Sequence, residues 1–380
     1  MNFKQNRLVV LYQPPPISNR YGRYWAWMHR VVLAHMGSMK PRSGSYHDPW
    51  ASELDPVMQL PELKYINDSL SDIMDDRAVE LFQHARSTGR RIYIMWSGGI
   101  DSTSVLTAFL KNISDYSILT VVYSEDSITE NPSYWQNYIL GKLDTAYVHD
   151  FKVSEEFFQR QGIVLTGDPA DALFGPSMGM YSGLIASGKH QENFLDHTNL
   201  IAFAIERYGQ QFIRDNDMQG FGRWYSTKVT NNLLEVKPAD VTSVADWWWW
   251  HYINLKWETS IWRPLVRCKS SHSESLSEHT IADFVASTFF NTARFQQWSY
   301  SNRHRFIINN DVSTHKHEIK KYIYDFDHND EYFNGKTKTM SLLNRNLKQF
   351  PVFVNWDWSS QPHGTEIEQE IVAKLEDYSG

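Results

Sequence analysis

The part of the chain best suited to chemistry is a glycine-rich turn after a short apolar run. The run ends at Trp96 and is followed by Ser97, Gly98, Gly99, Ile100, Asp101, Ser102 and Thr103. Glycines allow a backbone to approach an anion closely and to adopt unusual dihedral angles. If a helix begins here, its first amide groups and its dipole favour an anion. The hydroxyl groups add donors, and Asp101 can orient the loop amides or face Mg²⁺. The pattern predicts a phosphate-binding turn.

A second segment supplies two carboxylates close together in sequence. Asp168 and Asp171 follow the apolar run 162–166 and lie three residues apart. This spacing places both side chains near one metal–phosphate position if a helix begins there. Taken alone, the segment could equally be a helix-capping turn. Beside the glycine-rich turn, it predicts a site for Mg²⁺ and phosphate.

Both segments need a sheet to position them, and the sequence between residues 89 and 180 predicts one. Short apolar runs expected to be strands cover residues 91–96, 117–123, 145–149 and 162–166. Between them, helical periodicity covers residues 102–111, 132–143 and 155–161. This alternation predicts an α/β fold, a parallel sheet with helices on both faces. Ligands of such sheets bind at the carboxyl ends of the strands.

The chain as a whole divides into four regions. We expect a mixed N-terminal extension over 1–88, the phosphate-binding α/β core over 89–180, a mostly helical acceptor region over 181–350, and a polar acidic tail over 351–380. Residues 200–215 and 279–299 are predicted helices. The four consecutive tryptophans from Trp247 to Trp250 cannot share one helix face, so their helix should be packed on more than one side.

Composition restricts the class of protein. The formal net charge is -7, which disfavours a nucleic-acid binder without excluding one. The basic stretch from Arg303 to Lys321 is expected to be a solvated helix face. Cys268 is the one cysteine, so neither a disulfide nor a multi-cysteine metal site can form within the chain. No apolar run is long enough to span a membrane, and we expect a cytoplasmic protein.

The glycine-rich turn resembles the PP-loop of the N-type ATP pyrophosphatases, Ser-Gly-Gly-x-Asp-Ser. The resemblance implies an adenine nucleotide α-hydrolase-like fold, in which the loop binds the pyrophosphate of ATP and a substrate oxygen becomes adenylylated. The segment containing Asp168 and Asp171 resembles the signature of asparagine synthetases, whose acids serve Mg²⁺ and pyrophosphate. Here Pro169 replaces a glycine of that signature, and Ala172 replaces a third acid.

A weaker resemblance lies downstream. Residues 317–326 are similar to a helix of the asparagine synthetases whose lysine contacts the α-phosphate. The alignment implies that Lys321 has this role, with Lys320 as the alternative. Lys336 and Lys338 resemble the basic turn that follows that helix, and Lys338 is expected to bind ATP. Trp96 and Tyr123, at adjacent strand ends, are expected to line the adenosine pocket.

The resemblance also bears on the nitrogen source. Glutamine-dependent asparagine synthetases begin with a glutaminase domain whose nucleophile is a cysteine. Asn2 follows Met1 here, and the segment before the loop is too short for that domain. The amine would therefore come from ammonia, from a separate glutaminase or from the substrate itself.

Three functions follow as hypotheses. The first is an ATP- and Mg²⁺-dependent ligase that adenylylates a carboxylate or amide-like oxygen of a small molecule or peptide, releases pyrophosphate and joins an amine. The second is a PP-loop enzyme that modifies a nucleobase or nucleotide. The third is a non-catalytic ATP-binding scaffold.

Overall fold

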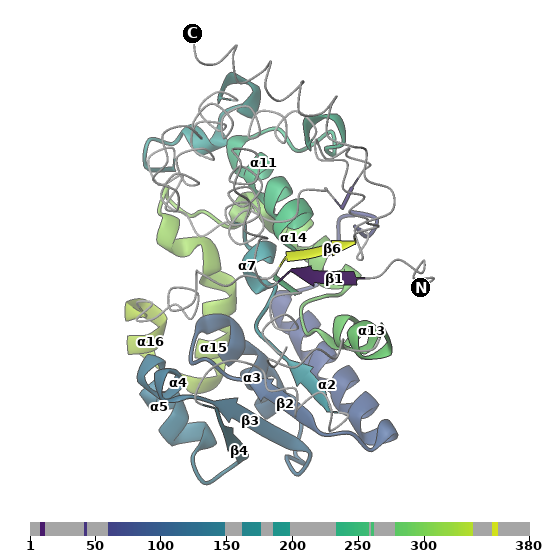
Figure 1. The fold of residues 1–380 in the computed structure, drawn as a ribbon. Helices are drawn as coiled ribbons and strands as arrows, with labels where there is room; N and C mark the ends of the chain where they lie inside the picture. The colour runs from purple at the N-terminus through teal and green to yellow at the C-terminus, as the bar shows by residue number, and fades with distance from the viewer. Residues whose placement is uncertain are drawn as a thin grey trace, which may run out of the picture.

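The structure is a computed structural model, and it describes residues 8–11, 42–43, 60–148, 162–175, 185–197, 233–257, 260–261, 278–336 and 352–355. Its centre is a four-stranded parallel sheet (Figure 1). The strands are β2 (Ile92–Met95), β3 (Leu119–Tyr123), β4 (Asp144–Tyr147) and β5 (Ile163–Leu165). Every residue of β2 and β5 is buried, as expected for uninterrupted apolar runs in a covered parallel sheet. The predicted α/β class is confirmed.

The order of the strands identifies where a ligand would bind. The sheet runs β4-β3-β2-β5, so the chain moves outward from β2 to β4 and then returns to the other side of β2. In register, Ile94 of β2 lies between Val121 of β3 and Leu165 of β5. The order therefore reverses between β2 and β5. A crevice forms at the carboxyl ends of two such strands, and open α/β sheets bind ligands there.

Three helices hold this edge of the sheet. They are α2 (Leu70–Thr88), α3 (Ile100–Asn112) and α15 (His317–Asp327). The first begins at the capping side chain of Ser69 and ends at Gly89, which has a positive φ of 65°. Both α2 and α15 pack against α3. Tyr322 of α15 donates a hydrogen bond to Asp75 of α2, so α15 is tied to α2 as well as packed against α3, the helix that begins at the glycine-rich turn.

Short helical segments follow β3. They are α4 (Glu125–Glu130), α5 (Pro132–Tyr134) and the π-helix η2 (Trp135–Ile139). The single predicted helix over residues 132–143 is thus shorter and changes its hydrogen-bond pattern after Tyr134.

The remaining described helices are α7 (Ala170–Leu173), α11 (Val244–His251), α13 (Glu278–Ser287), α14 (Ala293–Asn302) and α16 (Asp330–Gly335). The tryptophans of α11 are all at most 3% exposed, which confirms that this helix is packed on more than one side. The continuous helix predicted over residues 279–299 is wrong, because the chain breaks between α13 and α14. At that break, Arg77 donates to the carbonyl groups of Ala286, Thr288 and Phe289.

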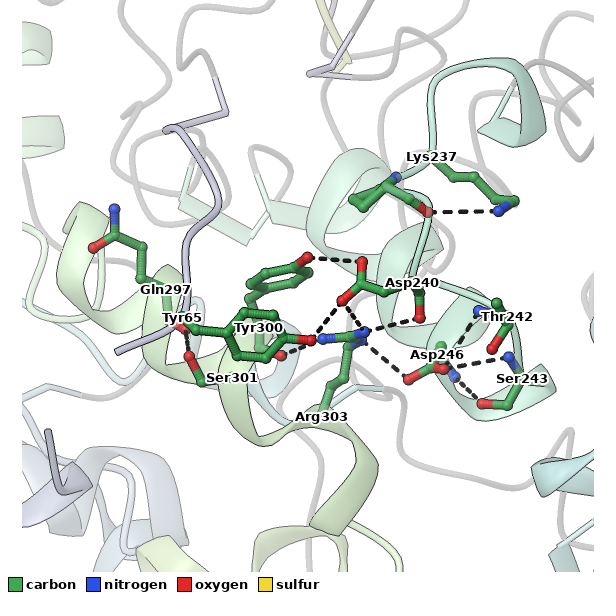
Figure 2. Close-up of polar contacts among 11 residues, drawn as sticks. Tyr65, Lys237, Asp240, Thr242, Ser243, Asp246, Gln297, Tyr300, Ser301 and Arg303 are labelled. Carbon is green, nitrogen blue, oxygen red and sulfur yellow. Dashed lines mark hydrogen bonds and ion pairs between the residues drawn. The ribbon is translucent and has the colours of Figure 1, made fainter. Parts of the chain in front are cut away.

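Arg303, just after α14, lies at the centre of a polar network that joins three segments of the helical part (Figure 2). Its guanidinium group contacts the Asp240 carboxylate at 2.8 Å and that of Asp246, in the first turn of α11, at 3.0 Å. It also donates to the carbonyl oxygens of Tyr300 and Asp240. Tyr65 and Tyr300 donate to the same Asp240 carboxylate. Arg303 is buried, so the solvated face predicted for the basic stretch is wrong at this residue.

Two strands from opposite ends of the chain form a separate pair. They are β1 (Leu8–Leu11) and β6 (Val352–Asn355), which are antiparallel. The predicted helices at 155–161 and 200–215, together with Cys268 and Lys338, lie outside the described residues. Within the described segments, no helix combines the length and apolar character needed to cross a membrane.

Candidate active site

The glycine-rich turn connects β2 directly to α3, as predicted. Gly99 occupies the N-cap position of α3 and provides no capping side chain. The first amide groups of α3 are therefore not capped by a side chain at that position, and a helix start of this kind favours an anion. The turn lies at the end of β2, beside β5, where the strand order reverses.

The hydroxyl groups of the turn form hydrogen bonds within the turn and with the Trp96 side chain. Ser102 Oγ accepts from the Ser97 amide at 3.0 Å and lies 2.9 Å from Ser97 Oγ. Thr103 is fully buried, and its Oγ1 accepts from the indole of Trp96 at 3.1 Å. We expected Ser97, Ser102 and Thr103 to supply hydroxyl donors to the anion. In the structure these hydroxyls fix the shape of the backbone, and the amides of Ser97 and Gly99 donate to the serine hydroxyls.

Two glycines are required by the packing around the turn. Gly98 has a φ of 72°, and a Cβ added there would lie 2.4 Å from the Ser127 carbonyl oxygen and 2.8 Å from Glu130 Cβ. A Cβ added to Gly167 would lie 2.7 Å from the Ser102 nitrogen and 2.8 Å from Asp101 Cβ. The backbone after β5 therefore touches the start of α3. This contact brings the two motifs together.

Lys316 joins the two motifs electrostatically. It immediately precedes α15, and its ammonium nitrogen lies 2.6 and 2.7 Å from the carboxylate oxygens of Asp101. The same nitrogen lies 2.5 Å from an oxygen of Asp171 on α7. One buried cation thus bridges the glycine-rich turn and the acidic segment. No sequence motif singles out Lys316, and the solvated face predicted for the basic stretch is wrong here too.

The charge of this lysine is stabilised by its two partners. Burial alone would lower the pKa of Lys316, but attraction to Asp101 and then to Asp171 more than reverses that effect, so its pKa is raised. The two carboxylates are less buried than the lysine, with 26% and 31% of their side chains exposed. A ligand can therefore reach the carboxylates from solvent, while the ammonium group is held behind them.

The structure separates the two lysines that the sequence could not distinguish. Lys321 is exposed and pairs with Asp325 one turn along α15, at 2.5 Å. It is not brought to the glycine-rich turn. Lys320 is half-buried, and its pKa is lowered by burial and then by repulsion from Lys316, with Lys336 adding to this. The charge of Lys320 therefore interacts with that of Lys316, and attraction to Asp311 opposes part of the lowering of its pKa.

The segment after α15 also reaches the turn. Tyr332 of α16 donates to the carbonyl oxygen of Gly98 at 3.3 Å. Lys336 forms a buried ion pair with Glu130, and it donates to the Glu130 carbonyl oxygen at 3.1 Å. Glu130 itself lies against Gly98. Residues more than two hundred positions apart in the sequence thus fix the outer wall of the turn.

The aromatic residues expected near adenosine form one cluster. Trp96 is fully buried and stacks on Trp135 with ring centroids 6.1 Å apart. Tyr123, at the end of β3, lies 4.4 Å from Trp135 and 5.6 Å from Tyr147. The Trp96 side chain is therefore part of the core and can offer a ligand only its backbone. Tyr123 and Tyr147 are the members that reach the surface.

Asp101 and Asp171 are the described carboxylates that fit a divalent cation best. Because both contact one ammonium nitrogen, their oxygens lie close enough to share one small ion. Mg²⁺ is commonly held by one or two carboxylates together with substrate phosphates and water, and this donor set fits that pattern. Asp168 lies at the turn between β5 and α7, where its amide donates to Thr166 Oγ1. Within the described ranges, no group of three or more His, Cys, Asp or Glu could hold a metal.

The structure therefore brings residues 97–103, Asp168 and Asp171 to one edge of the sheet, and it adds Lys316 to them. Lys321 lies elsewhere. Comparisons of the chain with protein-family models, with curated proteins and with solved structures found no match.

Proposed function

We propose that this protein is an AMP-forming ATP pyrophosphatase of the PP-loop type, with the turn 97–102 as its pyrophosphate site. The observation that carries the proposal is the position of Lys316. A buried cation joins one acid of each motif, Asp101 and Asp171, at the place where the strand order of the parallel sheet reverses. An ion pair that only stabilises the fold does not require an uncapped helix start beside it. A triphosphate site does, because the free amide groups of such a helix start bind phosphate.

In the proposed reaction, a substrate oxygen attacks the α-phosphorus of ATP and the bond to the bridging oxygen breaks. Pyrophosphate leaves and AMP stays attached to the substrate until an amine displaces it. The amide groups at the start of α3 bind the leaving pyrophosphate. Bound Mg²⁺ would neutralise phosphate charge beside Asp101 and Asp171. Lys316 and Lys320 provide positive charge that stabilises the pyrophosphate as negative charge develops on it, which favours the transition state over the ground state.

We therefore assign the stabilisation of charge at the α-phosphate to Lys316 and Lys320, and no longer to Lys321. Lys320 lies in the first turn of α15, and its charge interacts with that of Lys316, whereas Lys321 points about 100° away from Lys320. The adenosine pocket is proposed at the ends of β2 and β3, beside Tyr123. The ATP-binding role expected for Lys338 stays a prediction.

We retain the ligase as the first function within this class. The acceptor would be a small molecule or a peptide, and the amine would come from ammonia, a separate glutaminase or the substrate. Modification of a nucleobase is the second candidate, and the aromatic Tyr123 and Tyr147 at adjacent strand ends could stack on a base.

The test is to incubate the full chain with ATP, Mg²⁺, mixed carboxylic acids and hydroxylamine, and to follow phosphorus NMR. We expect AMP and pyrophosphate in equal amounts, with a hydroxamate formed from the acceptor. ADP and phosphate would contradict the proposal. ATP binding without turnover would support the scaffold. Turnover that requires a nucleic acid or nucleoside would support the second candidate.

Two neighbouring lysines provide a matched comparison. Lys320→Ala should lower turnover at least about tenfold, somewhat less than the 10²–10³ typical of a fully desolvated contact, because Lys320 is only half-buried. Lys321→Ala removes an exposed ion pair and should leave turnover within about twofold. The reverse result would show that α15 presents its other face to the nucleotide.

A further inference from the structure

The acid Asp171 is carried by a helix too short to hold itself in place. The helix α7 has four residues, so its last carbonyl groups have no partners within the helix. Asp171 nevertheless has to meet Lys316 and Asp101 in one geometry. The position of its carboxylate must therefore be set by contacts between α7 and the rest of the protein.

One such contact is polar and fully buried. Ser299 of α14 donates its hydroxyl hydrogen to the carbonyl oxygen of Leu173, the last residue of α7. Trp249 of α11 in turn donates its indole N–H to Ser299 Oγ at 2.6 Å. The incoming N–H occupies one lone pair of the hydroxyl and leaves its hydrogen for Leu173. Three helices are thus joined in a chain that ends two residues from Asp171.

The surroundings of this contact are apolar. Phe174, next to Leu173, packs on Trp298 and Phe306 with ring centroids 5.6 and 5.5 Å away. Removing the hydroxyl of Ser299 would leave the Leu173 carbonyl without this donor in an apolar environment, and a buried polar group left unpaired costs free energy. The end of α7 would then shift or open to water.

We propose that Ser299 is a positioning residue for Asp171: it fixes the end of α7 so that the carboxylate meets Lys316. Ser299 touches no part of the proposed nucleotide site. Its effect on turnover rests on the proposed function, but its effect on the placement of α7 does not. The two parts can therefore be measured separately.

The chain offers a matched control on the same helix. Ser301 also makes one contact as donor, to the carbonyl oxygen of Gln297, and one as acceptor, from the amide of Ile66 at 2.9 Å. Ser301→Ala removes the same chemical groups as Ser299→Ala from the same helix. It breaks no contact with α7. Ser299→Thr retains the hydroxyl and serves as the conservative variant.

The experiment measures hydrogen exchange of residues 163–175 and steady-state kinetics in the full chain. In Ser299→Ala we expect faster exchange in this segment, a kcat lower by roughly ten- to a hundredfold and an altered Mg²⁺ dependence, with KM for ATP nearly unchanged. The range corresponds to displacement of a positioned group by up to about 1 Å. Ser299→Thr should recover most of the rate, and Ser301→Ala should match the wild type in both measurements.

Two results would overturn the inference. One is unchanged exchange of residues 163–175 in Ser299→Ala. The other is faster exchange with kcat and Mg²⁺ dependence as in the wild type. A wild type that forms no AMP would instead remove the proposed function, while exchange would still decide the placement of α7. If Ser299→Ala does not fold, Ser299→Cys decides by the same two measurements, since its thiol fills the space of the hydroxyl but is only a weak donor to the Leu173 carbonyl.

Discussion

Two buried cations, Lys316 and Arg303, each hold a pair of aspartates, yet they serve different ends. Arg303 is fixed on every side: besides Asp240 and Asp246, its guanidinium donates to backbone carbonyl oxygens and lies 4.5 Å from the centre of the Tyr300 ring (Figure 2). Lys316 carries a compact ammonium group, and its observed ion pairs are with the carboxylates of Asp101 and Asp171. Carboxylates can be exchanged for phosphate oxygens, whereas a backbone carbonyl cannot leave. We propose that the Arg303 centre stabilises the fold and that the Lys316 centre binds a ligand.

The largest effect is expected from Arg303→Met. The substitution leaves Asp246 nearly buried without its cation, and breaking a buried pair in this way costs about 3–5 kcal/mol. The free energy of unfolding from denaturant titration should fall by that amount, while kcat of the folded fraction stays within a few-fold of the wild type. Arg294→Met, which removes partly exposed pairs on α14, should cost less than about 1 kcal/mol. A loss of kcat without a loss of stability in Arg303→Met would contradict the proposal that Arg303 stabilises the fold and takes no part in turnover.

Lys316→Met should have the opposite profile. Turnover should fall by two to three decades, or about 2.7–4 kcal/mol in the activation free energy, because the site loses its buried cation. The melting temperature should change less than in Arg303→Met. Lys316→Arg should not restore the rate, since a planar fork cannot occupy the position of an ammonium. Pyrophosphate release measures the effect, and wild-type turnover in a folded Lys316→Met would remove Lys316 from the mechanism.

Gly167→Ala tests whether the two motifs must touch. The added Cβ would lie 2.7 Å from the backbone at Ser102, so the segment after β5 must move away from α3. Overpacking of this kind costs typically 1–3 kcal/mol, and we expect turnover to fall with it. Gly335→Ala, which meets nothing within 4 Å, is the control and should leave both quantities unchanged. A fully active Gly167→Ala would show that the contact is incidental.

The smallest effect concerns the Arg303 side of the molecule and depends on pH. His251 of α11 is fully buried, and burial lowers its pKa to about 3. Because the unfolded chain takes up this proton near pH 6.5, the stability due to neutral His251 is complete above that pH. It is lost as the pH falls toward 3, at on the order of 1 kcal/mol per pH unit. Denaturant titrations at pH 7 and pH 5 should show a smaller decline for His251→Phe than for the wild type. Equal declines in the two proteins would contradict the lowered pKa of His251. The control is His84→Gln, which alters an exposed histidine on α2.

The sheet and the turn could be predicted because their signals are local. An apolar run, two glycines and a helix start lie within a dozen residues, and the observed β2 and α3 begin and end close to where the pattern places them. Asp168 and Asp171 could be found for the same reason. Local periodicity, however, could not show which of Lys316, Lys320 and Lys321 faces inward, because the contacts that bury Lys316 are with residues far away in the sequence.

The contacts that the sequence did not reveal are long-range. Lys316 lies 215 positions from Asp101, and Arg303 lies 63 positions from Asp240. No pattern in the basic stretch distinguishes a buried guanidinium from a solvated one, since burial is decided by the segments that fold over it. The predicted helix 279–299 failed similarly: the break after α13 is stabilised by Arg77, a residue of α2.

The contact between Tyr332 and the Gly98 carbonyl has a consequence for the order of events during synthesis. Strands β2 to β5 are complete once the ribosome has added residue 165, and a nascent chain can form the sheet then. Lys316, Tyr332 and Lys336 emerge about 150 residues later, which takes on the order of ten seconds at typical elongation rates. Until then the turn has neither its cation nor its outer wall. A growing chain therefore passes through a stage in which the parallel sheet exists without the contacts that complete the proposed nucleotide site, because these contacts can form only after residue 336 has been added.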